Sequence, residues 1–161
     1  MRNKFDQQLA QLNHEMIEMG ALCEEVIALS SRALTEGNVA LAAKVGPLDS
    51  EIDHKEREIE NLCLKLLLQQ QPVARDLRQI SAALKMITDM ERIGDQASDI
   101  ADMVPYIRFS EAKSKVHIEA MAKATVKMVT DSVEAFVQDD LDLAQRVIDS
   151  DDEVDDLFNK V

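Results

Sequence analysis

Apolar residues in the first part of the chain recur at alternating intervals of three and four residues, the spacing of a helix that buries one stripe in a bundle. The residues of this stripe are Leu9, Leu12, Met16, Met19, Cys23, Val26 and Ser30. Gly37 predicts the end of this first helix, because glycine readily takes the left-handed conformation found just past a helix end. A second helix is predicted from Val39, with a kink or restart at Gly46-Pro47 because proline lacks an amide donor.

The second helix continues on a new apolar stripe, and the run Leu66-Leu67-Leu68 at its end predicts burial on several sides. The stripe consists of Leu48, Ile52, Ile59, Leu62 and Leu66. After the connector Gln69-Gln70-Gln71, Pro72 suits the first turn of a third helix, which Pro105 ends. That helix carries two apolar stripes, so we expect it to pack between two neighbours.

A linker over 106–115 leads to a fourth helix at about 116–137. Asp139-Asp140 then offers the N-cap of a fifth helix, which continues to the chain end. No segment alternates between apolar and polar residues as a half-buried strand does. The predicted fold class is therefore all-α.

The sequence also repeats itself, since Asp151 follows Asp49 by 102 residues and the surrounding apolar positions match at the same offset. The matching pairs include Val39 with Leu141, Leu41 with Leu143, Val45 with Val147, Ile52 with Val154, and Ala33 with Ala135. The predicted domains are a first three-helix bundle over 1–105 and a partial second bundle over 106–161. The second repeat lacks its third helix.

Without a third helix, the apolar residues of the last two helices would stay exposed in the second bundle. These residues are Met121, Met128, Val129, Phe136, Leu143, Val147 and Val154. Such a patch would measure on the order of several hundred Å², as much as soluble monomers usually expose or more. We therefore expect the chain to form a homodimer through these helices, to exchange them between copies, or to pack them against the first bundle.

The net charge of −13 narrows the possible partners. It disfavours direct binding to nucleic acid, to an anionic membrane surface and to free phosphate. Cys23 and Cys63 form no C-x-x-C unit, so we expect buried thiols in a reducing compartment. No segment has a signal-peptide pattern or the ~18 consecutive apolar residues that span a bilayer. A cytoplasmic location is expected.

The most informative segment is Glu91-Arg92-Ile93-Gly94-Asp95 in the third helix. Glu91 and Asp95 are four residues apart, so their carboxylates share one helix face and repel each other, and Asp99 extends the row by another turn. Gly94 costs a further ~1 kcal/mol relative to alanine in a helix interior. These penalties suit a site where a cation bridges the carboxylates and another backbone comes close.

The same spacing occurs at Asp49 and Asp53 and again at Asp151 and Asp155. Because the connector after the second helix is short, that helix and the third should be antiparallel neighbours. This arrangement would bring Asp49 and Asp53 toward the row in the third helix. A site made only of carboxylates favours hard cations such as magnesium, manganese, calcium or ferric iron over zinc.

Other patterns allow other interpretations. Glu51 and His54 form an E-x-x-H unit, which is the ligand motif of ferritin-like di-iron bundles, but the repeat has Asp156 in place of the histidine. His14 and His117 are expected at the surface. No phosphate-binding loop, nucleophile elbow or Cys-His pairing is present, so the chain is not expected to be an enzyme. The basic segment Arg75-Asp76-Leu77-Arg78 either forms local salt bridges or contacts an acidic partner.

Two segments on the third helix resemble those of the PhoU family. Gln71-Pro72-Val73-Ala74-Arg75-Asp76-Leu77-Arg78 is similar to the family's Q-P-x-A-x-D-L-R, and the segment from Glu91 to Asp95 is similar to its E-R-I-G-D. The resemblance implies tandem three-helix bundles with metal held by E/D-x-x-x-D pairs. The residues that match these pairs are Asp49, Asp53, Glu91, Asp95, Asp151 and Asp155, with Asp99 as a neighbour.

The resemblance also implies a function. Members of the family are cytoplasmic, non-enzymatic regulators that restrain high-affinity phosphate uptake through the ATPase subunit of the phosphate ABC transporter. They also dampen the phosphate-sensing histidine kinase that activates starvation genes. Arg75, Asp76 and Arg78 are the candidates for partner contact, and iron, manganese or magnesium for the metal. The family pattern implies a further helix after Val161 with its own E-R-I-G-D, so a shortened member is expected.

Overall fold

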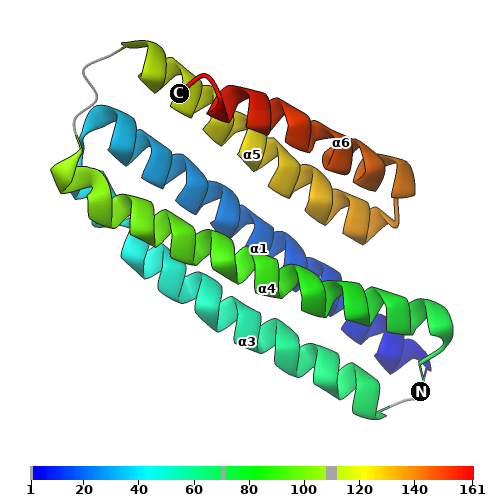
Figure 1. Ribbon diagram of the computed structural model, residues 1–161. Helices are drawn as coiled ribbons and strands as arrows, with labels where there is room; N and C mark the ends of the chain where they lie inside the picture. The colour runs from blue at the N-terminus through cyan, green and yellow to red at the C-terminus, as the bar shows by residue number, and fades with distance from the viewer. Residues whose placement is uncertain (1, 70–71, 108–111) are drawn as a thin grey trace.

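The computed structural model describes residues 2–69, 72–107 and 112–161, and every regular element in these ranges is a helix (Figure 1). The helices are α1 (Arg2–Glu36), α2 (Val39–Ala42), α3 (Val45–Gln69), α4 (Ala74–Met103), the short 3-10 helix η1 (Val104–Tyr106), α5 (Ala112–Gln138) and α6 (Leu141–Phe158). The predicted all-α class is confirmed. Residues 70–71 of the predicted connector and 108–111 of the predicted linker lie outside the described residues.

The long helices α1, α3 and α4 pack against one another as a three-helix bundle (Figure 1). Helix α5 packs along α1, and α6 packs along α5 on the side away from the bundle. The core includes Leu12, Met16 and Met19 of α1, Ile52 and Ile59 of α3, Ile80 and Ile87 of α4, and Val129 and Val133 of α5. Helix α5 therefore packs back against the first bundle, which was one of the three arrangements expected for it.

The turns that follow α1 and α5 have the same geometry, 102 residues apart. Gly37 and Asp139 both take the left-handed conformation, with φ of 62° and 54°. Asn38 and Asp140 then cap the next helix, each accepting a bond from the amide three residues further on, at 3.1 and 3.0 Å. The sequence repeat is thus matched by a repeated turn, and the predicted roles of Gly37 and Asp140 are confirmed.

Several predicted boundaries move by a few residues. The break in the second helix comes before Val45, so Pro47 lies in the first turn of α3, where its missing amide proton costs nothing. Pro72 lies ahead of α4, whose N-cap is Val73. Helix α5 begins at Ala112, four residues earlier than expected.

The prediction that the end of the second helix is buried on several sides is wrong. Leu66 is fully buried, but Leu67 is exposed and Leu68 is 85% exposed. The physical reason is that α3 packs mainly against α4 and α1, so the far side of its last turns meets solvent. The exposed leucines at this end have no role in the core.

Both cysteines are buried, as predicted. Cys23 donates a weak hydrogen bond from Sγ to the carbonyl oxygen of Met90 at 3.5 Å, and loss of solvent raises the pKa of its thiol to about 12. Burial also raises the pKa of the Cys63 thiol to about 11. The two thiols therefore act as small apolar groups in the core. In the described part of the chain, no helix is long and apolar enough to cross a membrane.

Candidate metal centre

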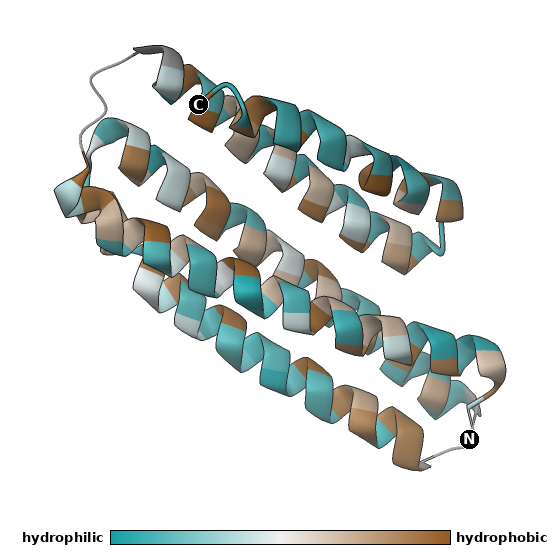
Figure 2. Ribbon diagram, in the orientation of Figure 1, coloured by the Kyte–Doolittle hydropathy of each residue, from teal (hydrophilic) through white to brown (hydrophobic). Residues whose placement is uncertain are grey.

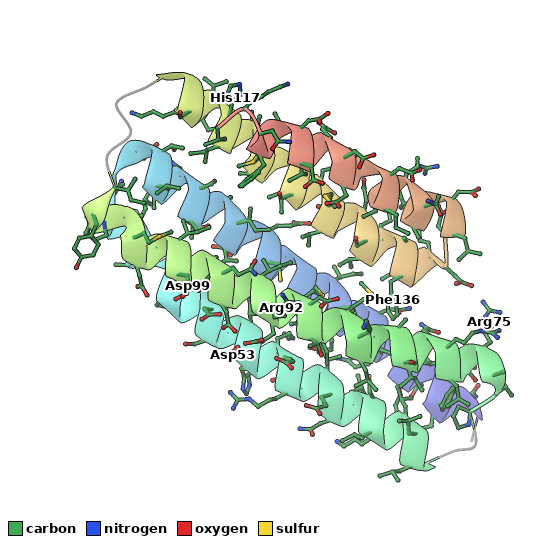
Figure 3. The ribbon with its side chains drawn as sticks, in the orientation of Figure 1. Asp53, Arg75, Arg92, Asp99, His117 and Phe136 are labelled. Atoms are coloured by element: carbon green, nitrogen blue, oxygen red, sulfur yellow. The ribbon has the colours of Figure 1, made fainter. Side chains whose placement is uncertain are left out.

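Carboxylates from α3 and α4 come together about halfway along the two helices, where these helices pack against each other (Figure 3). One oxygen each from Asp49, Asp53 and Asp95 lie within 4.8 Å of one another. A second group, within the same distance, consists of Asp53, Glu56 and Glu91. Asp53 belongs to both groups, so the five residues form one centre, which we call the α3–α4 carboxylate centre. The expected meeting of the two helices is what the structure shows.

Gly94 allows this close approach. A Cβ atom built on Gly94 would lie 2.6 Å from Oδ1 of Asp49 and 3.2 Å from Cδ1 of Ile52. Real Cβ atoms essentially never come as close as the first of these contacts, so a larger residue would push α3 away or displace the aspartate. The glycine that weakens the interior of α4 therefore brings the carboxylates of α3 against it.

Two oxygens of the centre lack a hydrogen-bond partner among the described residues. They are Oδ1 of Asp49 and Oδ1 of Asp53, and both are inaccessible to solvent. Burying a carboxylate oxygen without a partner is costly, and such groups call for a specific explanation. A cation bound by these oxygens would supply the missing interaction, so the residues present fit a hard metal ion.

Mutual repulsion and burial change the acidity of the centre. Burial first, and then the charges of Asp95 and Asp53, raise the pKa of Asp49 to about 6. Glu91 has its pKa raised to about 7, first by a hydrogen bond with Asp95 and then by burial. The pKa of Glu56 is also raised, by burial and then by Asp53. Without a cation, the centre therefore holds protons at a pH where isolated carboxylates have lost them.

These pKa shifts predict how the metal-free protein responds to pH. Asp49 and Glu91 have pKa values near 4 when unfolded and about 6 and 7 when folded, so the folded state binds more protons between pH 4 and 7. The free energy of unfolding should fall as the pH rises through this range. We expect the melting temperature in chelator to drop from pH 5 to pH 8, and to drop less in Glu91→Gln. Equal drops in both proteins would contradict this account.

The remaining predicted metal residues lie outside the centre. Asp99 is exposed on the next turn of α4 (Figure 3); its charge adds to the forces that raise the pKa of Asp49, but it belongs to neither group. Asp151 and Asp155 are exposed on α6, and within the described ranges no third carboxylate or histidine joins them. Glu56 was not predicted, although its spacing of three from Asp53 gave a signal that could have found it.

The histidines do not contribute to the centre. His54 is exposed and its Nε2 lies 2.9 Å from Glu58, and neither His54 nor Glu51 belongs to either carboxylate group. His14 is exposed and pairs with Glu18, as expected for a surface residue. His117 is partly buried, and its Nδ1 is buried without a partner in the described structure, so it is less exposed than a typical surface residue.

The predicted partner residues lie at the start of α4. Arg75 is exposed and its guanidinium lies 4.0 Å from Asp139 at the α5–α6 turn, a distance at which exposed charges stabilise little. Arg78 is also exposed. Asp76 is only 4% exposed, so its carboxylate is part of the packed first turn of α4 rather than the surface. The accessible charged residues of the basic segment are therefore its two arginines.

Comparison with known proteins identifies the family. A family model described as the PhoU domain matches residues 16–104 and 118–161, which include the Asp49/Asp53 pair of α3 and both family-like segments, 71–78 and 91–95. The chain belongs to the PhoU family. It is 36% identical over 159 residues to the phosphate-specific transport system accessory protein PhoU homolog of Aquifex aeolicus, with 98% of this chain and 72% of that protein covered.

Two further comparisons also match this chain to PhoU proteins. The homolog from Clostridium acetobutylicum is 35% identical over 162 residues, with 99% of this chain and 74% of the relative covered. The crystal structure of PhoU from Pseudomonas aeruginosa matches this structure with a TM-score of 0.88 and 31% sequence identity. That match covers 96% of this chain and 75% of the other. The resemblance drawn from the two motifs is confirmed.

Proposed function

We propose that this chain is a non-enzymatic regulator of phosphate homeostasis, acting in the cytoplasm through protein contacts. The observation that carries the proposal is membership of the PhoU family, whose relatives are named accessory proteins of the phosphate-specific transport system. The structure is consistent with a binding role, because Arg75 and Arg78 are exposed at the start of α4, where a partner protein can reach them. The function is negative control of high-affinity phosphate uptake and of phosphate-starvation signalling.

A bound hard cation is part of the proposal. The α3–α4 carboxylate centre consists of five carboxylates whose negative charges repel one another. Two of their oxygens are buried and lack a hydrogen-bond partner among the described residues. An iron, manganese or magnesium ion would neutralise the negative charge of these carboxylates and stabilise the packing of α3 against α4. Asp49, Asp53, Glu56, Glu91 and Asp95 would hold the ion.

The proposed partners are the ATPase subunit of the phosphate ABC transporter and the phosphate-sensing histidine kinase. Arg75 and Arg78 are exposed cations in a chain of net charge −13, so they are well placed to receive an acidic surface. A homodimer, expected from the sequence, remains part of the proposal, because α6 packs against α5 and keeps large apolar residues such as Ile148 exposed.

A reporter assay tests the regulatory role. In a bacterium that lacks its own PhoU-family protein, the wild-type chain should repress phosphate-starvation genes in phosphate-rich medium. We expect the double variant Arg75→Glu, Arg78→Glu to lose most of this repression, because reversed charges would repel an acidic partner. Circular dichroism should show an unchanged fold, since both side chains are exposed.

The control for that assay changes charge elsewhere by the same amount. Lys123 and Lys127 are exposed on α5, so Lys123→Glu, Lys127→Glu gives the same total charge as the arginine variant. This control should repress normally. Full repression by the folded arginine variant would show that the arginines make no regulatory contact, and failure of the wild-type chain to repress would contradict the proposed function itself.

A further inference from the structure

We propose that the end of the bundle where α3 stops and α4 starts is a docking surface for an acidic amphipathic helix of a partner protein. Its apolar part, which we call the leucine end, consists of Leu64, Leu67, Leu68, Val73 and Leu77. This inference rests on the proposed function, because it takes the ATPase subunit of the transporter as the protein that supplies the helix. It adds the chemistry of the contact and the residues that anchor it.

The leucine end exposes five large apolar side chains to solvent. Leu68 is 85% exposed and Val73 is 57% exposed, and the other three residues are each at least about a third exposed. Leu64 and Leu68 are one helical turn apart on α3, as Val73 and Leu77 are at the start of α4. Figure 2 shows the last turns of α3 as an apolar end on a helix whose outer surface is otherwise hydrophilic.

Exposed cations occur in the same part of the sequence as these side chains. Lys65, Arg75 and Arg78 are exposed, and the only acidic residue between positions 61 and 78 is Asp76, which is buried. Arg75 lies 4.0 Å from Asp139 of the α5–α6 turn, so Lys65 and Arg78 are the cations for which the described residues supply no ion-pair partner. The remainder of the chain carries a large excess of acids. An acidic partner would therefore be repelled by most of the molecule and attracted here, which fixes the place and the orientation of docking.

The exposed apolar residues of α5 and α6 do not combine these properties. On α6, Leu141, Ile148 and Phe158 are exposed, but that helix has only Arg146 as a cation against seven acids, so an acidic helix would be repelled. On α5, the lysines accompany a single large exposed apolar residue among the described positions, Val116. Neither α5 nor α6 pairs several exposed apolar residues with exposed cations as the leucine end does.

The spacing of the anchors fits a helix better than an extended peptide. The apolar pairs on the two antiparallel helices are spaced as a helical ridge is, so the apolar face of a third helix can pack on them with its acidic flank toward Lys65 and Arg78. A bilayer with anionic lipids would meet the same cations, but the net charge of −13 opposes approach of the molecule to such a surface. A protein helix is therefore the occupant that the charges favour.

Binding of the purified ATPase subunit tests the inference. The full chain and its variants are titrated with the subunit, and the dissociation constant is measured at low and moderate salt. Leu64→Ser, Leu68→Ser should weaken binding by about tenfold or more, because central apolar anchors dominate such interfaces. Arg75→Glu, Arg78→Glu should weaken it by a similar factor and flatten the salt dependence.

Matched controls keep the test specific. Ile148→Ser removes an equally exposed apolar side chain from α6, and Lys123→Glu, Lys127→Glu makes the same charge change on α5; both should bind as the wild type does. Because all the changed side chains are exposed, each variant should keep the wild-type melting temperature.

The outcomes separate the two proposals. No binding by the wild-type chain would overturn the proposed function and this inference together. Wild-type affinity in the leucine variant would overturn the inference and leave the proposed function standing. Binding to vesicles of anionic lipid that the leucine substitutions abolish would instead assign the surface to a membrane. A dimer in sedimentation velocity that dissociates with these substitutions would assign it to a second copy.

Discussion

Adding Mn²⁺, Mg²⁺ or Fe³⁺ to the chelator-treated chain is expected to raise its melting temperature, because a ligand that binds only the folded state stabilises it by mass action. At a metal concentration a hundred times the dissociation constant, the gain is about 2.7 kcal/mol. The double variant Glu91→Ala, Asp95→Ala should lose this gain, since it removes both α4 ligands of the α3–α4 carboxylate centre.

The matched control for that experiment is Asp151→Ala, Asp155→Ala. These residues have the same spacing on a helix but lie exposed on α6, outside both carboxylate groups. We expect the control to keep the full metal-dependent rise. The variant of Glu91 and Asp95 should be no less stable than the wild type in chelator, because it relieves repulsion. A wild-type chain whose melting temperature ignores all three metals would contradict the account.

Substituting Gly94 by alanine is expected to destabilise the protein, although alanine is the better helix former by about 1 kcal/mol. The new Cβ would lie 2.6 Å from Oδ1 of Asp49 and 3.2 Å from Ile52, so α3 and α4 must move apart. Overpacking of this kind typically costs about 1–3 kcal/mol. We expect this cost to exceed the stability gained from the better helix propensity of alanine. The displaced Asp49 should also weaken metal binding.

Gly46 provides the control for this substitution. It lies in the first turn of α3, and a Cβ there would have no atom within 4 Å. Gly46→Ala should therefore leave the melting temperature unchanged or raise it slightly. Thermal unfolding of both variants, with and without Mn²⁺, is the measurement. If Gly94→Ala were as stable as Gly46→Ala and responded equally to metal, the close approach at Gly94 would have no structural role.

The helices and their buried faces could be predicted because each apolar stripe repeats with the helical period. The stripe through Met16, Met19 and Cys23 is fully buried, and so are Ile52 and Ile59 on the next helix. The exposure of Leu68 could not be predicted in this way, because periodicity shows which residues are apolar and not whether a neighbour covers them. That depends on which helices reach the end of α3.

Part of the candidate centre could also be predicted from the sequence. Asp49, Asp53, Glu91 and Asp95 were found from their spacing whereas Glu56 was not, and the mid-helix Gly94 indicated a close approach. The pair on α6 has the same spacing, but no third carboxylate or histidine of the described residues joins it, as expected for an incomplete second site. The sequence did not show that Asp76, between two exposed arginines, is buried, since a charged residue in a basic segment is usually read as a surface residue.

The most direct test of the central claim, that the α3–α4 carboxylate centre binds a hard cation, is anomalous X-ray diffraction from crystals grown with Mn²⁺. The account predicts an anomalous peak between α3 and α4, within about 2–2.5 Å of carboxylate oxygens of Asp53 and at least two of Asp49, Glu56, Glu91 and Asp95. No peak at this position, or a peak only at exposed acids such as Asp151 and Asp155, would contradict it.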